Sequence, residues 1–181
     1  MRSFITLLVI LICFQAFSNE IGTWKDYYCY QGATKVFYKN NQTYCVTNNG
    51  LFNYDNSNAE LNLFSKINFT SDYGVNNLAF SPNGIIISYD NSTIDLIDER
   101  STISISDIRS LEIAGKKINN LSVIDQDLYV SASYGVSKIN LFKKEISDTY
   151  YLYKNGESLE INDFQKIDNC FVVATKEGVF K

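Results

Sequence analysis

The stretch YCVTNNGLFNYD, residues 44–55, decides the fold of this chain because it is typical of two strands joined by a tight turn at Asn49 and Gly50. The same pattern returns as ISYDNSTIDLID (87–98), VSASYGVSKIN (130–140) and FVVATKEGVFK (171–181). One apolar position after each turn recurs at spacings of 43, 42 and 43 residues and is held by Leu51, Ile94, Val136 and Val179. A second position recurs at spacings of 42, 43 and 43 residues and is held by Val36, Leu78, Leu121 and Phe164. A repeat of about 40–45 residues made of short strands indicates the blades of a β-propeller.

The repeat therefore predicts an all-β fold, a partial β-propeller of about three and a half four-stranded antiparallel blades. We expect a signal peptide over residues 1–18 and an incomplete N-terminal propeller domain over residues 19–181. Since a closed propeller generally needs about four to eight blades, the chain looks like a fragment of a longer protein. A short chain that closes its ring by dimerising is the alternative.

Finer strand positions follow from the alternation of apolar and polar residues, which predicts outer strands at 61–68 and 149–153. The aromatic stretch IGTWKDYYCY, residues 21–30, precedes the first unit and is interpreted as the outer strand of a closing blade, or as a cap on a local core. The second hairpin has Ser92 and Thr93 where the other units have glycine, so we expect a different turn there. Apolar residues three apart are expected near the ring axis, in VNNL (75–78), INNL (118–121) and INDF (161–164).

The first 18 residues, MRSFITLLVILICFQAFS, have the features of a signal peptide cleaved before Asn19. One arginine precedes the apolar run, and Ala16 and Ser18 are the small residues before the cut. A membrane anchor is the alternative, but residues 4–14 fall short of the roughly 20 apolar residues that a span needs. Lipid attachment at Cys13 is disfavoured because bulky Ile12 precedes it.

Composition excludes several classes of function. The formal charge of −4, without a run of Lys or Arg, argues against a nucleic-acid partner. The chain has no histidine, which excludes His-based catalytic triads and His metal sites. With 45% hydrophobic residues, it can bury a substantial core.

The sequence gives no candidate catalytic or metal-binding residues, no cofactor and no identifiable binding residues, so we predict that the chain is not an enzyme. Three carboxylate pairs occur, Asp125/Asp127, Asp90/Asp95 and Asp98/Glu99, and none is expected to be functional. The first and third lie at turn or strand ends and are interpreted as ordinary solvated turn residues. None has the spacing of a calcium loop. Tyr134, before Gly135, could line a ligand-binding face or pack in the core, and the sequence alone does not distinguish these two roles.

Three cysteines follow the predicted signal peptide: Cys29, Cys45 and Cys170. Their number is odd and their spacing matches no metal or redox motif. Buried, inert cysteines within strands are the expectation, while a disulfide among them stays open because exported proteins can oxidise thiols.

Longer segments resemble the start of proteins of the PorZ family, accessory components of the type IX secretion system of Bacteroidota. The resemblance covers residues 21–181 and is carried by IGTWKDYYCYQGATKV (21–36), YCVTNNGLFNYD (44–55) and LFSKINFTSDYGVNNLAFSPNGIIISYDNSTIDLID (63–98). Phe69 and Thr70 depart from the Gly-Leu that is usual in the family. The hairpin alone is also similar to the repeat of two-component regulator propellers.

The resemblance implies two seven-bladed propellers followed by a β-sandwich, on the outer surface of the outer membrane. It also implies partners: the sortase PorU, the outer-membrane proteins PorV and PorQ, and anionic lipopolysaccharide, to which the complex links its cargo. The family supplies no catalytic residue for this region. The competing hypotheses are the extracytoplasmic sensor propeller of a hybrid histidine kinase, and a propeller enzyme acting on sugars through an acid such as Asp125.

Overall fold

The computed structural model describes residues 29–98, 100–113, 115–168 and 170–181. The signal peptide expected over residues 1–18 lies outside the described residues, as does almost all of the strand expected over residues 21–30. No helix within the described ranges is both long enough and apolar enough to cross a lipid bilayer.

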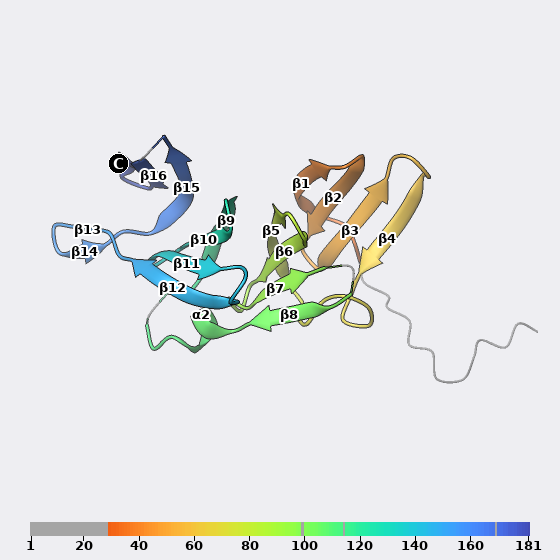
Figure 1. Ribbon diagram of the computed structural model, residues 1–181, viewed down its shortest axis with the longest axis horizontal. Coiled ribbons are helices and arrows are strands. Elements are labelled where there is room, and N and C mark those ends of the chain that lie inside the picture. The colour runs from red at the N-terminus through yellow and green to blue at the C-terminus, as the bar shows by residue number, and fades with distance from the viewer. Residues whose placement is uncertain (1–28, 99, 114, 169) are drawn as a thin grey trace, which may run out of the picture.

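In the described part of the chain, four antiparallel sheets of three or four strands follow one another in sequence order (Figure 1). The first contains β1 (Ala33–Lys39), β2 (Gln42–Thr47), β3 (Gly50–Asp55) and β4 (Glu60–Phe64). The second contains β5 (Val75–Ser81), β6 (Gly84–Tyr89), β7 (Ile94–Ile97) and β8 (Thr102–Ile105). The third contains β9 (Ile118–Ile124), β10 (Asp127–Ala132), β11 (Gly135–Asn140) and β12 (Glu145–Tyr150). The fourth contains β15 (Ile161–Ile167), β16 (Cys170–Thr175) and β17 (Gly178–Phe180).

Two short elements connect these sheets. The helix α2 (Asp107–Ser110) lies between the second and third sheets, and the hairpin of β13 (Tyr153–Lys154) and β14 (Glu157–Ser158) lies between the third and fourth. The strand order runs sequentially within each four-stranded sheet, and successive sheets fan out as blades (Figure 1). The predicted all-β partial propeller is therefore confirmed.

Two predicted outer strands need correction. The first, β4, ends at Phe64 instead of reaching residue 68, because the chain turns at Ser65. The Ser65 carbonyl accepts the amides of Asn68, Phe69 and Thr70, while the Asn68 side chain accepts the Ser65 amide at 2.8 Å.

The third outer strand, β12, spans 145–150 instead of 149–153. Asn140 causes the difference because its side-chain oxygen accepts the amides of Phe142 and Lys143, at 3.1 and 2.8 Å. This makes a tight turn, which Lys144 completes with a φ of 62°, so the return strand starts earlier than the apolar pattern predicts.

The expected difference in the second hairpin is confirmed. Ser92 has a φ of 67°, and the Tyr89 amide donates to the Thr93 carbonyl at 3.0 Å. In the third hairpin Gly135 instead has a φ of 147°, and a Cβ at this glycine would overlap the carbonyl oxygen of Tyr150. Glycine is needed there because no side chain fits against β12.

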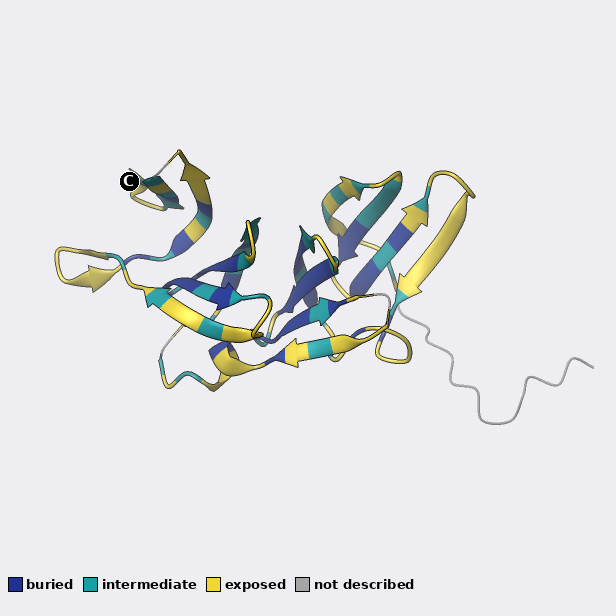
Figure 2. Cartoon of the chain, in the orientation of Figure 1, coloured by how far each residue is buried: buried dark blue, intermediate teal, exposed yellow. Residues whose placement is uncertain are grey.

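Among the residues that the structure describes, the core lies between neighbouring sheets, in three clusters of buried apolar side chains. Figure 2 shows the buried residues concentrated on strands of the second and third blades, above all β6, β10 and β11, while β4 is mostly exposed. The apolar residues predicted near the ring axis are all buried on the inner strands β5, β9 and β15; they are Val75, Leu78, Ile118, Leu121, Ile161 and Phe164. Apolar side chains on the first and fourth sheets remain exposed, among them Val36 at 65% and Val179 at 72%.

Polar side chains also join the inner strands of successive blades. The Asn77 amide donates to the Asn119 carbonyl at 3.1 Å and to the Asn120 side chain at 3.2 Å. One blade further on, Asn119 donates to the Ile161 carbonyl at 2.9 Å, and Asn120 donates to the Asp163 carboxylate. The asparagines of β5 and β9 thus form a ladder of hydrogen bonds that links the inner strands of the second, third and fourth blades.

Candidate ligand pocket between the second and third blades

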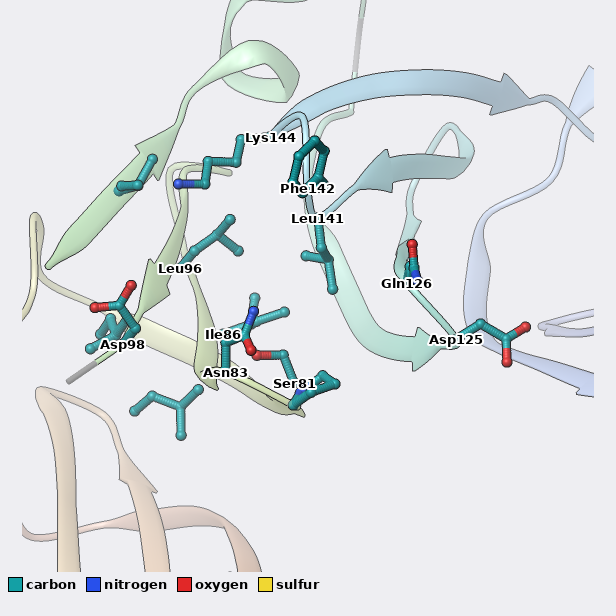
Figure 3. Close-up of a pocket in the computed structure, with 14 residues that line it drawn as sticks. Ser81, Asn83, Ile86, Leu96, Asp98, Asp125, Gln126, Leu141, Phe142 and Lys144 are labelled. Atoms are coloured by element: carbon teal, nitrogen blue, oxygen red, sulfur yellow. The ribbon is translucent and has the colours of Figure 1, made fainter. Parts of the chain in front are cut away.

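A pocket of about 390 Å³ opens where turns of the second and third blades meet. The second blade supplies the β5–β6 turn and the residue that follows β7, and the third supplies the β9–β10 and β11–β12 turns (Figure 3). The pocket is lined by Ser81, Pro82, Asn83, Ile85, Ile86, Leu96, Ile97, Asp98, Ile103, Asp125, Gln126, Leu141, Phe142 and Lys144.

Local sequence holds these turns in place. Ser81 donates its hydroxyl to the Gly84 carbonyl at 3.3 Å, across a turn that contains the chain's only proline. In the third blade Asp125 takes a φ of 56°, a conformation that aspartate tolerates better than most residues. The Leu141 amide donates to the Gln126 carbonyl at 3.1 Å. The two turns of the third blade are thereby fastened together and form one wall.

The pocket has an apolar floor and a polar rim. Ile86 is fully buried at its base, and Leu96 and Leu141 pack as partly buried neighbours of the same core cluster. Phe142 stands at the rim with 87% of its surface exposed, the largest exposed fraction among the described large apolar residues. An apolar floor with a few polar groups around it is typical of sites that bind small ligands or side chains.

The charges at the rim are two carboxylates and one ammonium group. Amide hydrogen bonds from Arg100 and Ser101 hold the pKa of Asp98 below its usual range, with Lys144 adding to the effect. Asp125 is paired with Lys166 at 3.6 Å and is largely exposed. The rim therefore carries an ionised carboxylate, Asp98, at neutral pH.

In the interface between the first and second blades, the repeat positions equivalent to those beside the pocket have aromatic side chains. Phe37 and Tyr44 are cross-strand partners on β1 and β2. Their ring centroids lie 6.4 and 5.3 Å from that of Phe80 on the second blade. Three aromatic rings thus occupy this interface.

Aromatic rings also fill the interface of the third and fourth blades. Tyr129 on β10 stacks on Phe164 with centroids 4.6 Å apart, and its centroid lies 5.7 Å from that of Phe171. Tyr129 pairs with Ser122, as Tyr44 pairs with Phe37.

The interface that contains the pocket has no such rings at these positions. The cross-strand pair on β5 and β6 is Ala79 and Ile86, and Val123 on the third blade takes the repeat position of Phe80. Ile86 lines the pocket where the adjacent blades have Tyr44 and Tyr129, so the smaller side chain at this repeat position leaves space there, while Ala79 and Val123 pack in the core cluster next to it. Sequence reasoning missed this site, although the aligned repeats contain the signal.

Of the carboxylate pairs considered in the sequence, Asp90 and Asp95 have different environments. Asp95 is fully buried, and its carboxylate accepts the Ser71 amide at 2.8 Å, the Ser71 hydroxyl at 2.7 Å, and the hydroxyls of Tyr89 and Ser104. Asp90 is exposed. Asp95 thus ties the segment before β5 to β7 and β8, which is a structural role.

The other two pairs also have separate structural partners. Asp127 makes a salt bridge with Lys138 at 3.0 Å, whereas Asp125 pairs with Lys166. Asp98 caps the turn after β7, and Glu99 lies outside the described residues.

The remaining sequence candidates have structural environments. Cys29, Cys45 and Cys170 are free thiols. Cys45 is buried in β2 as expected, whereas Cys170 lies in β16 but is only partly buried. Cys29 is exposed and precedes β1, which corrects the expectation of a buried strand cysteine at that position. Tyr134 is buried, with its hydroxyl 2.7 Å from that of Ser137, and is a packing residue. No cluster of three or more potential metal ligands occurs among the described residues.

The fold, with its pocket between blades, defines the chain as a β-propeller module. The chain belongs to the PorZ N-terminal β-propeller family, described as "TSS9, PorZ, N-terminal beta-propeller domain", whose profile matches residues 43–181. A comparison with curated protein sequences finds no match.

Solved structures with low sequence identity share the fold. The chain is similar to the computationally designed Ika8 protein, with a TM-score of 0.60 at 16% identity over 81% of this chain and 44% of that one. It is also similar to the extracellular domain of BT4673 from B. thetaiotaomicron, described as a hybrid two-component system, with a TM-score of 0.64 at 14% identity over 86% of this chain. The computationally designed Ika4 protein gives a TM-score of 0.58 at 16% identity over 91% of this chain and 98% of that one.

The chain spans less than half of Ika8 and only 21% of the BT4673 domain. At these identities the likeness concerns the fold alone.

Proposed function

We infer that the chain is a non-enzymatic propeller module of a PorZ-like component of the type IX secretion system. The observation that carries this inference is the family match over residues 43–181. The module is exported by the predicted signal peptide and works on the outer face of the outer membrane.

Its role is to assist the attachment of secreted cargo to anionic lipopolysaccharide. The partners in this proposal are the sortase PorU and the outer-membrane proteins PorV and PorQ, together with the lipopolysaccharide itself. Propellers suit such a role because the loops of successive blades converge at the ends of the ring and offer a broad surface for binding. The pocket between the second and third blades opens among such loops.

The test is co-purification with the complete protein. Tagged full-length protein, expressed in its own cells, is expected to retain PorU and anionic lipopolysaccharide, whereas a matched protein lacking residues 43–181 is expected to lose at least one of them. Equal capture by both proteins would contradict a binding role for this propeller.

A second candidate is a ligand-sensing propeller of a hybrid two-component system, favoured by the fold shared with the BT4673 extracellular domain. It predicts that the complete protein contains a kinase whose autophosphorylation responds to a ligand of the propeller. Fractionation of the protein with outer-membrane partners, without such kinase activity, would oppose this candidate.

A further inference from the structure

We propose that the pocket between the second and third blades is an anchor site for one aromatic side chain of a partner protein, presented beside a basic residue. This inference rests on the proposed role as a binding module and names the chemistry that one of its sites recognises.

The neighbouring interfaces show what the space accepts. Tyr44 and Tyr129 hold the same repeat position on the first and third blades, and each packs against aromatic rings of the following blade. Ile86 holds this position on the second blade and lines the pocket. A ring supplied by a ligand would therefore take a place that the fold fills with its own rings on either side.

Size and surface agree with an aromatic occupant. A pocket of about 390 Å³ lies near the lower end of the roughly 300–1,000 Å³ range of ligand sites, which suits a side chain with its adjoining backbone. The exposed ring of Phe142 stands at the rim, where it can contact an entering ring edge to face (Figure 3).

The rim favours a cation next to that aromatic group. Of the two lining carboxylates, Asp125 is paired with Lys166 at 3.6 Å, whereas Asp98 makes no salt bridge among the described residues and is the negative group open to a ligand cation. The chain as a whole carries a formal charge of −4. Asp98 remains ionised because backbone amides donate to it.

A sugar ligand fits less well than an apolar side chain. The floor is aliphatic, and two of the polar lining groups are already engaged, since the Ser81 hydroxyl donates to the Gly84 carbonyl and Asp98 caps its own turn. Sugar hydroxyl groups that enter such a floor would lose hydrogen bonds to water without replacement.

The probe is a capped peptide, Gly-Lys-Phe-Lys-Gly, titrated into the full-length protein by calorimetry. We expect saturable binding, weakened about tenfold or more when the peptide phenylalanine is replaced by alanine, and weakened again when both lysines are replaced by glutamate. Methyl glucoside is the competing sugar probe. Equal affinity of the phenylalanine and alanine peptides, or preferential binding of methyl glucoside, would overturn the inference.

Two variants locate the binding to the pocket. Ile86→Tyr introduces the side chain found at this position in the adjacent blades and is expected to reduce peptide affinity about tenfold or more by filling the space. Phe142→Ala removes an exposed ring, so the fold should tolerate it while peptide affinity falls several-fold. Tyr153→Ala removes another exposed aromatic ring, at 65% exposure and outside the pocket lining, and serves as the matched control.

The outcomes separate this inference from the proposed function. Unchanged peptide binding by both pocket variants would overturn the anchor site. Failure of the wild-type protein to bind the peptide would also overturn it, while co-purification with PorU and lipopolysaccharide would still stand as a separate result for the proposed function. If Ile86→Tyr unfolds the protein, Phe142→Ala and the peptide series still decide the question.

Discussion

Replacing Asp95 with alanine should destabilise the second blade strongly, because this fully buried carboxylate gathers four donor groups. They are the amide and hydroxyl of Ser71 and the hydroxyls of Tyr89 and Ser104. The Asp95→Ala change removes the acceptor and leaves the Tyr89 hydroxyl and the Ser71 amide without their carboxylate partner.

The magnitude follows from these contacts. The Tyr89 hydroxyl is the buried donor that loses its partner, which costs about 1–3 kcal/mol. Ser71 and Ser104 are exposed, and the Ser71 amide keeps the Tyr89 hydroxyl as an acceptor at 3.1 Å, so their losses add little. For a domain of roughly 150–250 residues, each kcal/mol lowers Tm by about 2–4 °C. We therefore expect Tm to fall by about 2–12 °C. Tyr89→Phe removes one donor and should cost only about 1 kcal/mol.

The assay is urea and thermal unfolding of the full-length protein, followed by near-UV circular dichroism. Asp148→Ala changes an exposed aspartate on β12 and is the matched control, expected to stay within about 0.5 kcal/mol of the wild type. If the free energy of unfolding of Asp95→Ala also stays within about 0.5 kcal/mol of the wild-type value, the carboxylate does not hold the segment before β5 in the way described.

Three further predictions use the same unfolding assay. Gly135→Ala should cost about 1–3 kcal/mol, because the new Cβ strains a φ of 147° and collides with β12; a neutral effect would show that β12 yields easily. Asn77→Ala should cost about 1–3 kcal/mol by removing the two hydrogen bonds to the next blade, and Asn49→Ala, at an exposed turn, should cost less. Burial, together with the hydrogen bond to Asp95, raises the pKa of Tyr89 above its ordinary value. Unfolded tyrosine therefore loses its proton first, and stability should fall by up to about 1.4 kcal/mol per pH unit above about pH 10. Tyr89→Phe should flatten that slope, and an unchanged slope would contradict the assignment.

The repeat made the blades predictable, because two apolar positions recur in every unit and are buried in the second and third blades, at Leu78, Ile94, Leu121 and Val136. The outer strands were less predictable. The burial of β4 and β12 is weak and irregular, so apolar alternation carries little information there. Their bounds depend instead on side chains that bond to turn amides, as Asn68 and Asn140 do.

The pocket was not predicted because it depends on differences between repeats, whereas the fold was found from what the repeats share. Ala79 and Ile86 look like ordinary core residues when their unit is considered alone. Only a comparison of the β5–β6 register with the β1–β2 register shows that Ala79 and Ile86 occupy the positions of Phe37 and Tyr44 in the first blade. The family resemblance, by contrast, was carried by longer segments and is confirmed by the match over residues 43–181.

The ladder of asparagines has a polarity, since the donor always belongs to the earlier blade and the acceptor to the later one. Each blade thus has two unlike sides, and neighbours associate head to tail. An in-frame duplication of the second or third repeat, each about 43 residues long, would place a matching donor against a matching acceptor at the new junction. A duplication that begins within a repeat would leave donors and acceptors unmatched. We therefore expect homologous propellers to differ by the gain or loss of whole repeats.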